Sequence, residues 1–257
     1  MRANLLSALV VGALLVPGTD AQAAPSAKQI VDRAIDNQAF SLPGAEMRMK
    51  MLLRNRRGGI RERQLFSKTK QKGGLSRTLT RFVAPPDVAG TSFLFVEKKG
   101  QEDEQHMYMP ALKMVKRIAG AQKNARFMGS DFSYADMESR DLENAGHKLL
   151  KSEKVAGVDC YLVEAIPTNK TAYAKVHTWV RKKDFVFVRT RYFDTKGREL
   201  KTVFVKAVTK VGGRPIPSRI KVSNVQTKHS TLLEITQIKA RGDLPESEFT
   251  IRTLKKR

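Results

Sequence analysis

Hydrophobic residues along most of this chain recur at every second position, which is the period of a β-strand with one buried face. The exception lies near the start, where four apolar residues follow helical spacing: Ile30, Val31, Ala34 and Ile35. Ser26 and Gln29 precede this stripe as a capping box, in which each side chain accepts a hydrogen bond from the other residue's backbone N–H. The pattern therefore predicts an amphipathic helix over residues 26–39, followed by strands.

Segments of alternating polarity then follow one another almost to the C-terminus, separated by short turns. Several turns carry Gly in hairpin positions, as at Gly58-Gly59, Gly73-Gly74 and Gly212-Gly213. Connections this short join antiparallel strands, because parallel strands need a crossover of a dozen residues or more. We predict a mainly β protein of the α+β class, built on one large, curved antiparallel sheet. The predicted strands are residues 45–54, 61–70, 75–83, 92–98, 104–109, 112–118, 147–154, 158–166, 173–181, 185–193, 199–211, 215–224 and 229–240.

A sheet of this length needs cover for its buried face, and only the helix and residues 120–146 are free to supply it. Such thin cover leaves two arrangements open: the sheet closes into a full barrel, or it stays partly open around a cavity. Large flexible side chains favour a cavity, because unbranched Met adapts to varied apolar guests. The same residues also suit an ordinary packed core, and composition alone leaves both open. The candidate cavity residues are Met47, Met49, Met51, Leu53, Phe93, Phe95, Met107 and Met109.

Residues 1–23 have the pattern of a cleavable secretory signal peptide. A positively charged start is followed by an apolar run over residues 5–16, too short to span a bilayer, and by an A-x-A cleavage site that ends at Ala23. Residues 24–257 are predicted to form a single domain, long enough to bury a sizeable core. Cys160 is the only cysteine, so no internal disulfide can form and the role of this thiol stays open.

The charge is strongly unbalanced. Lys and Arg number 48 against 25 Asp and Glu, which gives a formal net charge of +23. Nucleic acid is the first partner such a balance suggests. However, the basic residues alternate with apolar ones in predicted strands, as in residues 47–51 and 203–207, and zinc-finger spacing, RNP-like motifs and a basic helix are all missing from the sequence. We therefore exclude nucleic acid and expect an anionic membrane surface or an acidic protein to be the attracted partner.

Candidate catalytic chemistry is sparse. The four histidines, His106, His147, His177 and His229, follow no metal-ligand spacing, and each falls singly in a predicted strand. One cysteine excludes C-x-x-C redox chemistry and cysteine-based zinc sites. The sequence around Ser130 lacks the G-x-S-x-G elbow, and no Gly-rich phosphate loop opens a helix. We expect neither catalytic residues, nor a metal site, nor a cofactor, and we predict that the protein is not an enzyme.

Several segments together resemble a known family. They are RFVAPPDVAGTSFLFV (81–96), MYMPALKMVKRI (107–118), FMGSDFSYADM (127–137), YAKVHTWV (173–180) and YFDTKGRELK (192–201). In this order they resemble the LolA-like, outer-membrane lipoprotein-sorting family over roughly residues 40–254. The block F-x-G-S-D-F-S-Y-x-D is the most specific of them.

The resemblance implies a periplasmic protein of a Gram-negative bacterium, with an incomplete β-barrel whose concave apolar face is lidded by short helices. It also implies a carrier of lipid or acylated lipoprotein that works between an inner-membrane exporter and an outer-membrane acceptor. No Cys stands directly after the apolar run of the signal peptide, which resembles the soluble carrier rather than the anchored acceptor. The same fold also serves periplasmic regulators that sense lipid or lipoprotein, so a sensing regulator is the alternative function.

One position departs from the family pattern. Carriers of the family have an Arg just before a Pro that follows an early strand, and that Arg latches the lid helices. Here Ala84 precedes Pro85, so the resemblance supplies no latch at this position.

Residues 126–141, RFMGSDFSYADMESRD, are predicted to form the lid, and a static packed connection held by the same contacts is the alternative. Ser133 and Asp136 suit the start of a short helix over about 133–140. We expect Phe127 and Phe132 to point into the cavity mouth. We expect the acids to stay outside, near Arg117 or Lys113: they are Asp131, Asp136, Glu138 and Asp141. The full set of candidate lid residues is Phe127, Gly129, Ser130, Asp131, Phe132, Tyr134 and Asp136.

Overall fold

The computed structural model describes residues 24–138, 145–168 and 172–256. The predicted signal peptide, residues 1–23, lies outside the described residues, as does Asp141 of the predicted lid. That residues 24–257 form a single domain stays a prediction.

The described chain is mostly β and forms one 13-stranded antiparallel sheet. A strand occupies every range predicted from the alternating pattern. The strands are β1 (Gly44–Arg54), β2 (Ile60–Lys72), β3 (Leu75–Ala84), β4 (Ser92–Val96), β5 (Glu104–Met109), β6 (Met114–Ile118), β7 (Gly146–Val155), β8 (Val158–Ile166), β9 (Tyr173–Arg181), β10 (Phe187–Asp194), β11 (Glu199–Val211), β12 (Arg214–Asn224) and β13 (His229–Ala240).

Two strands begin later than predicted, for a local reason. Lys113 and Phe185 have φ angles of 50° and 56°, and a residue in the left-handed region cannot continue a pleated strand. β6 therefore begins at Met114, after a 3-10 turn (η2, Pro110–Leu112), and β10 begins at Phe187.

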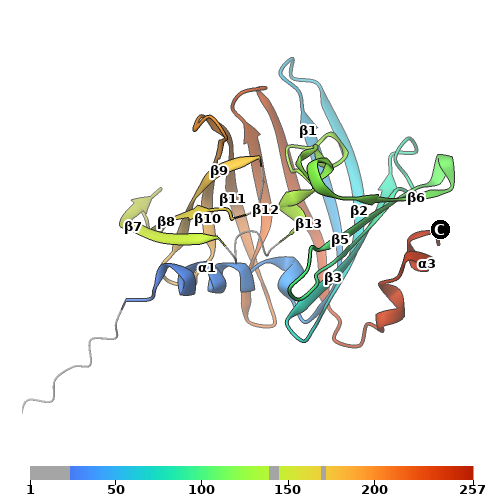
Figure 1. The fold of residues 1–257 in the computed structure, drawn as a ribbon, viewed down its shortest axis with the longest axis horizontal. Helices are drawn as coiled ribbons and strands as arrows, with labels where there is room; N and C mark the ends of the chain where they lie inside the picture. The colour runs from blue at the N-terminus through green and yellow to red at the C-terminus, as the bar shows by residue number, and fades with distance from the viewer. Residues whose placement is uncertain (1–23, 139–144, 169–171, 257) are drawn as a thin grey trace, which may run out of the picture.

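The sheet is curved but not closed into a barrel. Its strand order is β6-β5-β4-β3-β2-β1-β13-β12-β11-β10-β9-β8-β7, so β6 and β7 are its two edges within the described residues. The pairing of β1 with β13 joins the N-terminal and C-terminal halves of the sheet. This confirms the open form of the two arrangements that the sequence left undecided (Figure 1).

The N-terminal helix, α1 (Ala27–Asp36), begins as predicted but ends at Asp36, before the predicted end at residue 39. The Ser26 side chain accepts a hydrogen bond from the backbone N–H of Gln29, and the Gln29 side chain accepts one from the backbone N–H of Ser26. Its predicted apolar stripe is buried and packs on Val163 of β8 and Val180 of β9. A 3-10 turn, η1 (Ala39–Ser41), then lies against β2 and β3, so the N-terminal segment bridges the two halves of the sheet (Figure 1).

Residues 119–138, which we call the inner segment, leave β6 and lie against the concave face. They form only single 3-10 turns: η3 (Gly120–Asn124), η4 (Phe127–Gly129) and η5 (Ala135–Met137). The predicted helix over 133–140 is therefore one turn within the described residues, with its last two positions outside them.

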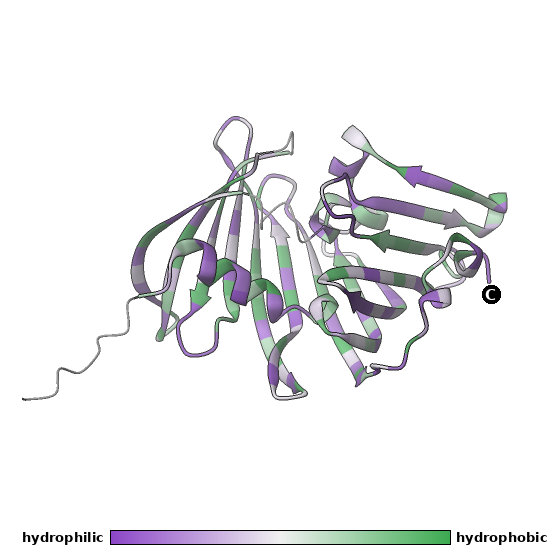
Figure 2. Ribbon diagram, turned by 60° about the horizontal axis from the view of Figure 1, so that its bottom comes forward, coloured by the Kyte–Doolittle hydropathy of each residue, from purple (hydrophilic) through white to green (hydrophobic). Residues whose placement is uncertain are grey.

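The C-terminal segment covers part of the outer face. After β13, the turn η6 (Glu246–Glu248) and the helix α3 (Ile251–Leu254) bring Phe249 and Leu254 onto Leu79 of β3 and Leu94 of β4 (Figure 1). Elsewhere polar and apolar residues alternate along the strands, as Figure 2 shows. This outer cover was not predicted from the sequence, because four helical residues are too few for a periodic signal.

Candidate functional site

The concave face of the sheet carries the main hydrophobic core. Strand β1 presents alternate residues to it, and its register with β2 places Met49 opposite Leu65 on the same face. From the inner segment, Phe127 packs into this core with its ring centroid 4.8 Å from that of Phe93 and 5.5 Å from that of Tyr134. The predicted inward direction of Phe127 is confirmed, since only 3% of this residue is exposed.

An apolar cavity of about 250 Å³ lies beside this core. Its wall is formed by α1, by strands of both halves of the sheet and by the inner segment. Strands from both halves of the open sheet line the cavity, so it forms without closure of the sheet into a barrel. Its apolar lining includes Val31, Ile35, Met49, Met51, Leu65, Phe95, Phe127, Phe132, Val163, Val180, Val203, Val222 and Leu233.

The predicted cavity residues divide into three groups. Met49, Met51 and Phe95 line the cavity. Met47, Leu53 and Phe93 are buried in the same core cluster, and Met107 packs against it, but these four do not line the cavity. Met109 ends β5 and belongs neither to this cluster nor to the lining. The C-terminal half of the wall was not predicted, because its Val and Leu residues are as typical of any strand core as of a cavity.

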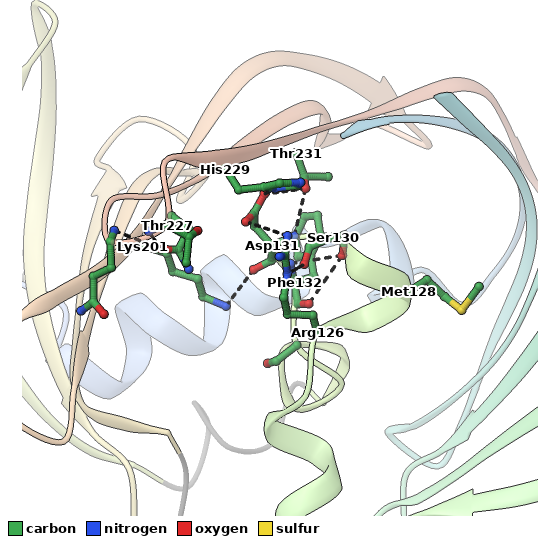
Figure 3. Close-up of polar contacts among 12 residues, drawn as sticks. Arg126, Met128, Ser130, Asp131, Phe132, Lys201, Thr227, His229 and Thr231 are labelled. Atoms are coloured by element: carbon green, nitrogen blue, oxygen red, sulfur yellow. Dashed lines mark hydrogen bonds and ion pairs between the residues drawn. The ribbon is translucent and has the colours of Figure 1, made fainter. Parts of the chain in front are cut away.

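The acids of the inner segment are not outside, which corrects the sequence expectation. The carboxylate of Asp131 is 0% exposed. One of its oxygens accepts hydrogen bonds from Thr231 Oγ1 and His229 Nδ1 of β13, each at 2.7 Å, and the other lies 3.4 Å from Arg126. The backbone N–H of Asp131 donates to Thr231 Oγ1 at 2.9 Å (Figure 3). Asp131 therefore ties the inner segment to β13.

Asp136 forms the second buried attachment. Its carboxylate forms an ion pair with Lys201 of β11, and Tyr173 of β9 donates to it at 2.9 Å. The Lys201 ammonium also donates to the backbone carbonyl of Asp131 at 3.3 Å (Figure 3). It lies 4.8 Å from the centre of the Tyr192 ring. Burial raises the pKa of Tyr173 above its usual range, and Asp136 raises it further, so this phenol stays a donor.

Glu138 forms the third attachment, on the opposite half of the sheet. Its carboxylate lies 2.7 Å from the Lys123 ammonium and accepts from the amide of Gln105 on β5 at 2.6 Å. Burial opposes the charge on Lys123, but Glu102 and Glu138 outweigh it and raise the pKa of the lysine. Among the residues that the structure describes, the acids do not pair with Arg117 or Lys113, the partners expected from the sequence. Opposite charge alone does not reveal which strands the segment lies against after folding.

A further contact of the inner segment was not predicted from the sequence. The guanidinium of Arg63 on β2 donates to the backbone carbonyl of Met128 and lies over the Phe82 ring at 5.8 Å. That carbonyl precedes Gly129, whose φ of 74° closes the turn. The buried Ser130 hydroxyl accepts from the N–H of Phe132 at 3.3 Å. Arg63 thus joins the inner segment to β2, the strand next to the one that ends at Ala84.

The described residues contain no group of three or more His, Cys, Asp or Glu side chains arranged to hold a metal ion. In the same part of the chain, no helix is both long and apolar enough to cross a membrane. His106, His147, His177 and His229 each lie on a different strand, as predicted. Cys160 is fully buried, and burial raises the pKa of its thiol.

Comparison with known proteins adds to this geometry. No curated protein matches the sequence. Among solved structures, a candidate outer membrane lipoprotein-sorting protein domain from Vibrio parahaemolyticus is 31% identical, with a TM-score of 0.83 over 90% of this chain and 98% of that one. A DUF1329 family protein from Desulfovibrio piger is 28% identical, with a TM-score of 0.82 over 90% of this chain and all of the other.

A LolA superfamily protein from Nitrosomonas europaea shares the fold, with a TM-score of 0.73 at 18% identity over 90% of this chain and 100% of the other. A family model that is described only as an uncharacterised protein matches residues 74–256. With its open antiparallel sheet, buried inner segment and these relatives, the chain belongs to the family of the outer membrane lipoprotein-sorting protein domain and has the LolA-like fold.

Proposed function

We propose that this protein is a periplasmic carrier that binds acyl chains of a lipid or lipoprotein and moves them from the inner to the outer membrane. The observation that carries the proposal is the apolar cavity of about 250 Å³ between α1, the concave sheet and the inner segment. A cavity lined mainly by apolar surface, with polar groups at its wall that can orient a ligand, is the usual form of a small-molecule site. The proposed activity is binding and transfer, without catalysis, metal or cofactor.

The energetics of acyl chains make such a carrier necessary. Each CH₂ removed from water gains about 0.8 kcal/mol, so a sixteen-carbon chain gains on the order of 12 kcal/mol when fully buried. Free passage through an aqueous compartment is therefore very slow. A carrier must bury the chain well enough to extract it and must then release it to an acceptor.

The inner segment is the element suited to controlled release. Its Phe127 and Phe132 line the cavity, while its backbone forms only single 3-10 turns. Polar side chains hold it to both halves of the sheet, through Asp131, Asp136 and Glu138. Separating these contacts would expose the cavity without breaking the strand ladders. We therefore assign the lid role to this segment.

The route and the partners belong to the same proposal. Residues 1–23 act as the signal peptide, residues 24–257 form the mature single domain, and cargo passes from an inner-membrane exporter to an outer-membrane acceptor. The relative from Vibrio parahaemolyticus is named for outer membrane lipoprotein sorting, which supports this direction. Exposed Lys and Arg on the strands favour contact with anionic headgroups.

Two measurements test the proposal. Organic extracts of the protein purified from its own periplasm should contain acylated molecules by mass spectrometry. The purified protein should bind a fluorescent acyl probe with a sixteen-carbon chain, and Val203→Phe should weaken binding at least tenfold by filling the cavity that Val203 lines. Val83→Phe is the matched control, because Val83 is 45% exposed.

The outcome separates the alternatives. A wild-type protein that binds no acyl probe, and carries none from the periplasm, contradicts the carrier. A protein that binds lipid but transfers none between vesicles, while its affinity for a protein partner changes with lipid, is the sensing regulator instead.

A further inference from the structure

The wall of the cavity has a charge opposite to that of the whole chain. The formal net charge of the protein is +23, yet the ionisable groups that line the cavity are mainly carboxylates. Besides Lys201, whose ammonium is paired with Asp136, the lining contains Glu97, Asp103, Glu104 and Glu138. These groups have protein partners of their own, so the acidic wall alone does not define a site.

Gln105 supplies a second, independent observation. This residue of β5 is 0% exposed and lines the cavity between Phe95 and Ile118 of the neighbouring strands. Its side-chain Nε2 donates to the backbone carbonyl of Tyr134 at 3.0 Å and to Glu138 Oε1 at 2.6 Å. Both partners are acceptors, so the amide nitrogen must face them and the amide orientation is fixed by the network.

The other end of this amide has no partner. Gln105 Oε1 is buried and accepts no hydrogen bond from any of the residues that the structure describes. A buried acceptor that is left unpaired costs free energy. A ligand that carries a donor would recover this cost once the side chains that cover Gln105 Oε1 move aside. A carboxylate or phosphate cannot provide that donor, and its charge would be repelled by the carboxylates of the same wall.

We propose that Gln105 marks a polar subsite of the cavity that takes the hydrogen-bond-donating end of an apolar ligand. The chemical class is a long acyl or alkyl chain that ends in an ammonium, amide N–H or hydroxyl group, in preference to a carboxylate or phosphate. This inference rests on the proposed function and deepens it by naming the polar end of the cargo. It makes the cavity selective for head groups as well as for chains.

Ligands that share one chain test the preference. Dodecylamine, dodecanamide, dodecanol and dodecanoate should each be titrated as competitors of N-phenyl-1-naphthylamine in the wild-type protein. The donor-bearing ligands should compete about tenfold or more better than dodecanoate, the ratio that one well-made hydrogen bond supports. The overall charge of +23 would favour the anionic dodecanoate over dodecylamine. Tighter binding of the donor-bearing ligands must therefore come from the cavity wall. Equal or tighter binding of dodecanoate overturns the inference.

A variant locates the preference at Gln105. Gln105→Met keeps the length of the side chain but removes the acceptor, so the advantage of dodecanamide over dodecanoate should fall to about threefold or less. Thr190→Val is the control, because Thr190 lines the cavity from β10 in the other half of the sheet. It should keep the wild-type ratio. An unchanged ratio in Gln105→Met contradicts the assignment.

Failure of this inference is distinguishable from failure of the proposed function. If every twelve-carbon ligand displaces the probe equally, the cavity binds chains and only the polar subsite is wrong. If no ligand binds the wild-type protein at all, the carrier proposal itself fails. Should Gln105→Met not fold, the ligand series on the wild-type protein decides alone.

Discussion

Lys201 of β11 and Asp136 of the inner segment form an ion pair across 65 residues of sequence. Their side chains are only 4% and 9% exposed, so neither charge can be hydrated while the pair remains closed. Two such groups stabilise each other mainly by relieving the cost of burial. The position of the inner segment therefore depends on a contact that the cavity wall itself provides.

Removing one partner should be far more costly than removing both. We expect Lys201→Met to lower the free energy of unfolding by about 3–5 kcal/mol, because Asp136 is left as an unpaired buried charge. The double variant with Asp136→Asn should recover part of this loss. Urea unfolding measures the stability of the wild type, of Lys201→Met and of the double variant. Lys206→Met, an exposed change on the same strand, is the control and should stay within about 0.5 kcal/mol of wild type. Equal stability of Lys201→Met and the control would contradict a buried pair.

The inner segment should open more readily than the strands around it. Its residues 126–138 form single 3-10 turns and one isolated bridge, Arg126 with Ser133, whereas β10 is hydrogen-bonded on both sides. We expect faster amide hydrogen exchange in 126–138 than in β10 for the empty protein, and slower exchange once an acyl ligand packs on Phe127 and Phe132. Exchange as slow as that of β10, with and without ligand, would make α1 the better gate.

A carboxylate placed in the apolar wall should abolish ligand binding. Phe95 lines the cavity and is only partly buried, so Phe95→Asp is expected to fold while making burial of an acyl chain unfavourable. Ile60→Asp, at a position that is 64% exposed, should bind as wild type does. Circular dichroism checks both folds, and fluorescent fatty-acid titration measures binding. Undiminished binding by a folded Phe95→Asp protein would place the ligand elsewhere.

Docking to membranes should depend on salt. With a formal net charge of +23, the protein should bind vesicles that contain phosphatidylglycerol at low salt and lose most of that binding by about 0.15 M, where the Debye length is about 8 Å. Replacing the exposed Lys206 and Lys210 by Glu should weaken it further. Acyl ligand inside the cavity should be retained throughout. Binding that salt does not change would leave the basic surface with a role in solubility alone.

Asp194 should contribute a pH-dependent part of the stability. A hydrogen bond from the Gln226 side chain, together with those from Arg198 and Lys196, lowers the pKa of Asp194 from 3.8 to about 2. A carboxyl whose pKa is depressed by folding stabilises the protein above its ordinary pKa and loses that contribution as the pH falls toward the folded value. The stability difference between wild type and Asp194→Asn should thus be constant above about pH 5 and shrink from about pH 4 toward 2. A difference that does not change over this range would contradict the shift.

The candidate site was predictable only in part. Met49, Met51 and Phe95 could be named because large apolar residues alternate in their strands, and all three line the cavity. The carboxylates of Asp131 and Asp136 were expected in water, since unpaired acids are rarely buried. Their burial depends on Thr231, His229 and Lys201, which stand far away in sequence. Nothing local to the inner segment identifies such partners.

The sequence by itself determined the start and the buried face of the N-terminal helix, the succession of strands and the antiparallel connections, because each follows from side-chain period and turn chemistry within about ten residues. Tertiary structure alone decided that the sheet stays open between β6 and β7. It also decided that buried ion pairs hold the inner segment against the sheet. The same holds for Gln105 Oε1, an acceptor that stays unpaired in a residue of the cavity wall. The physical reason is that solvation and pairing of a polar group depend on whatever surrounds it after folding, whereas backbone period depends only on its neighbours along the chain.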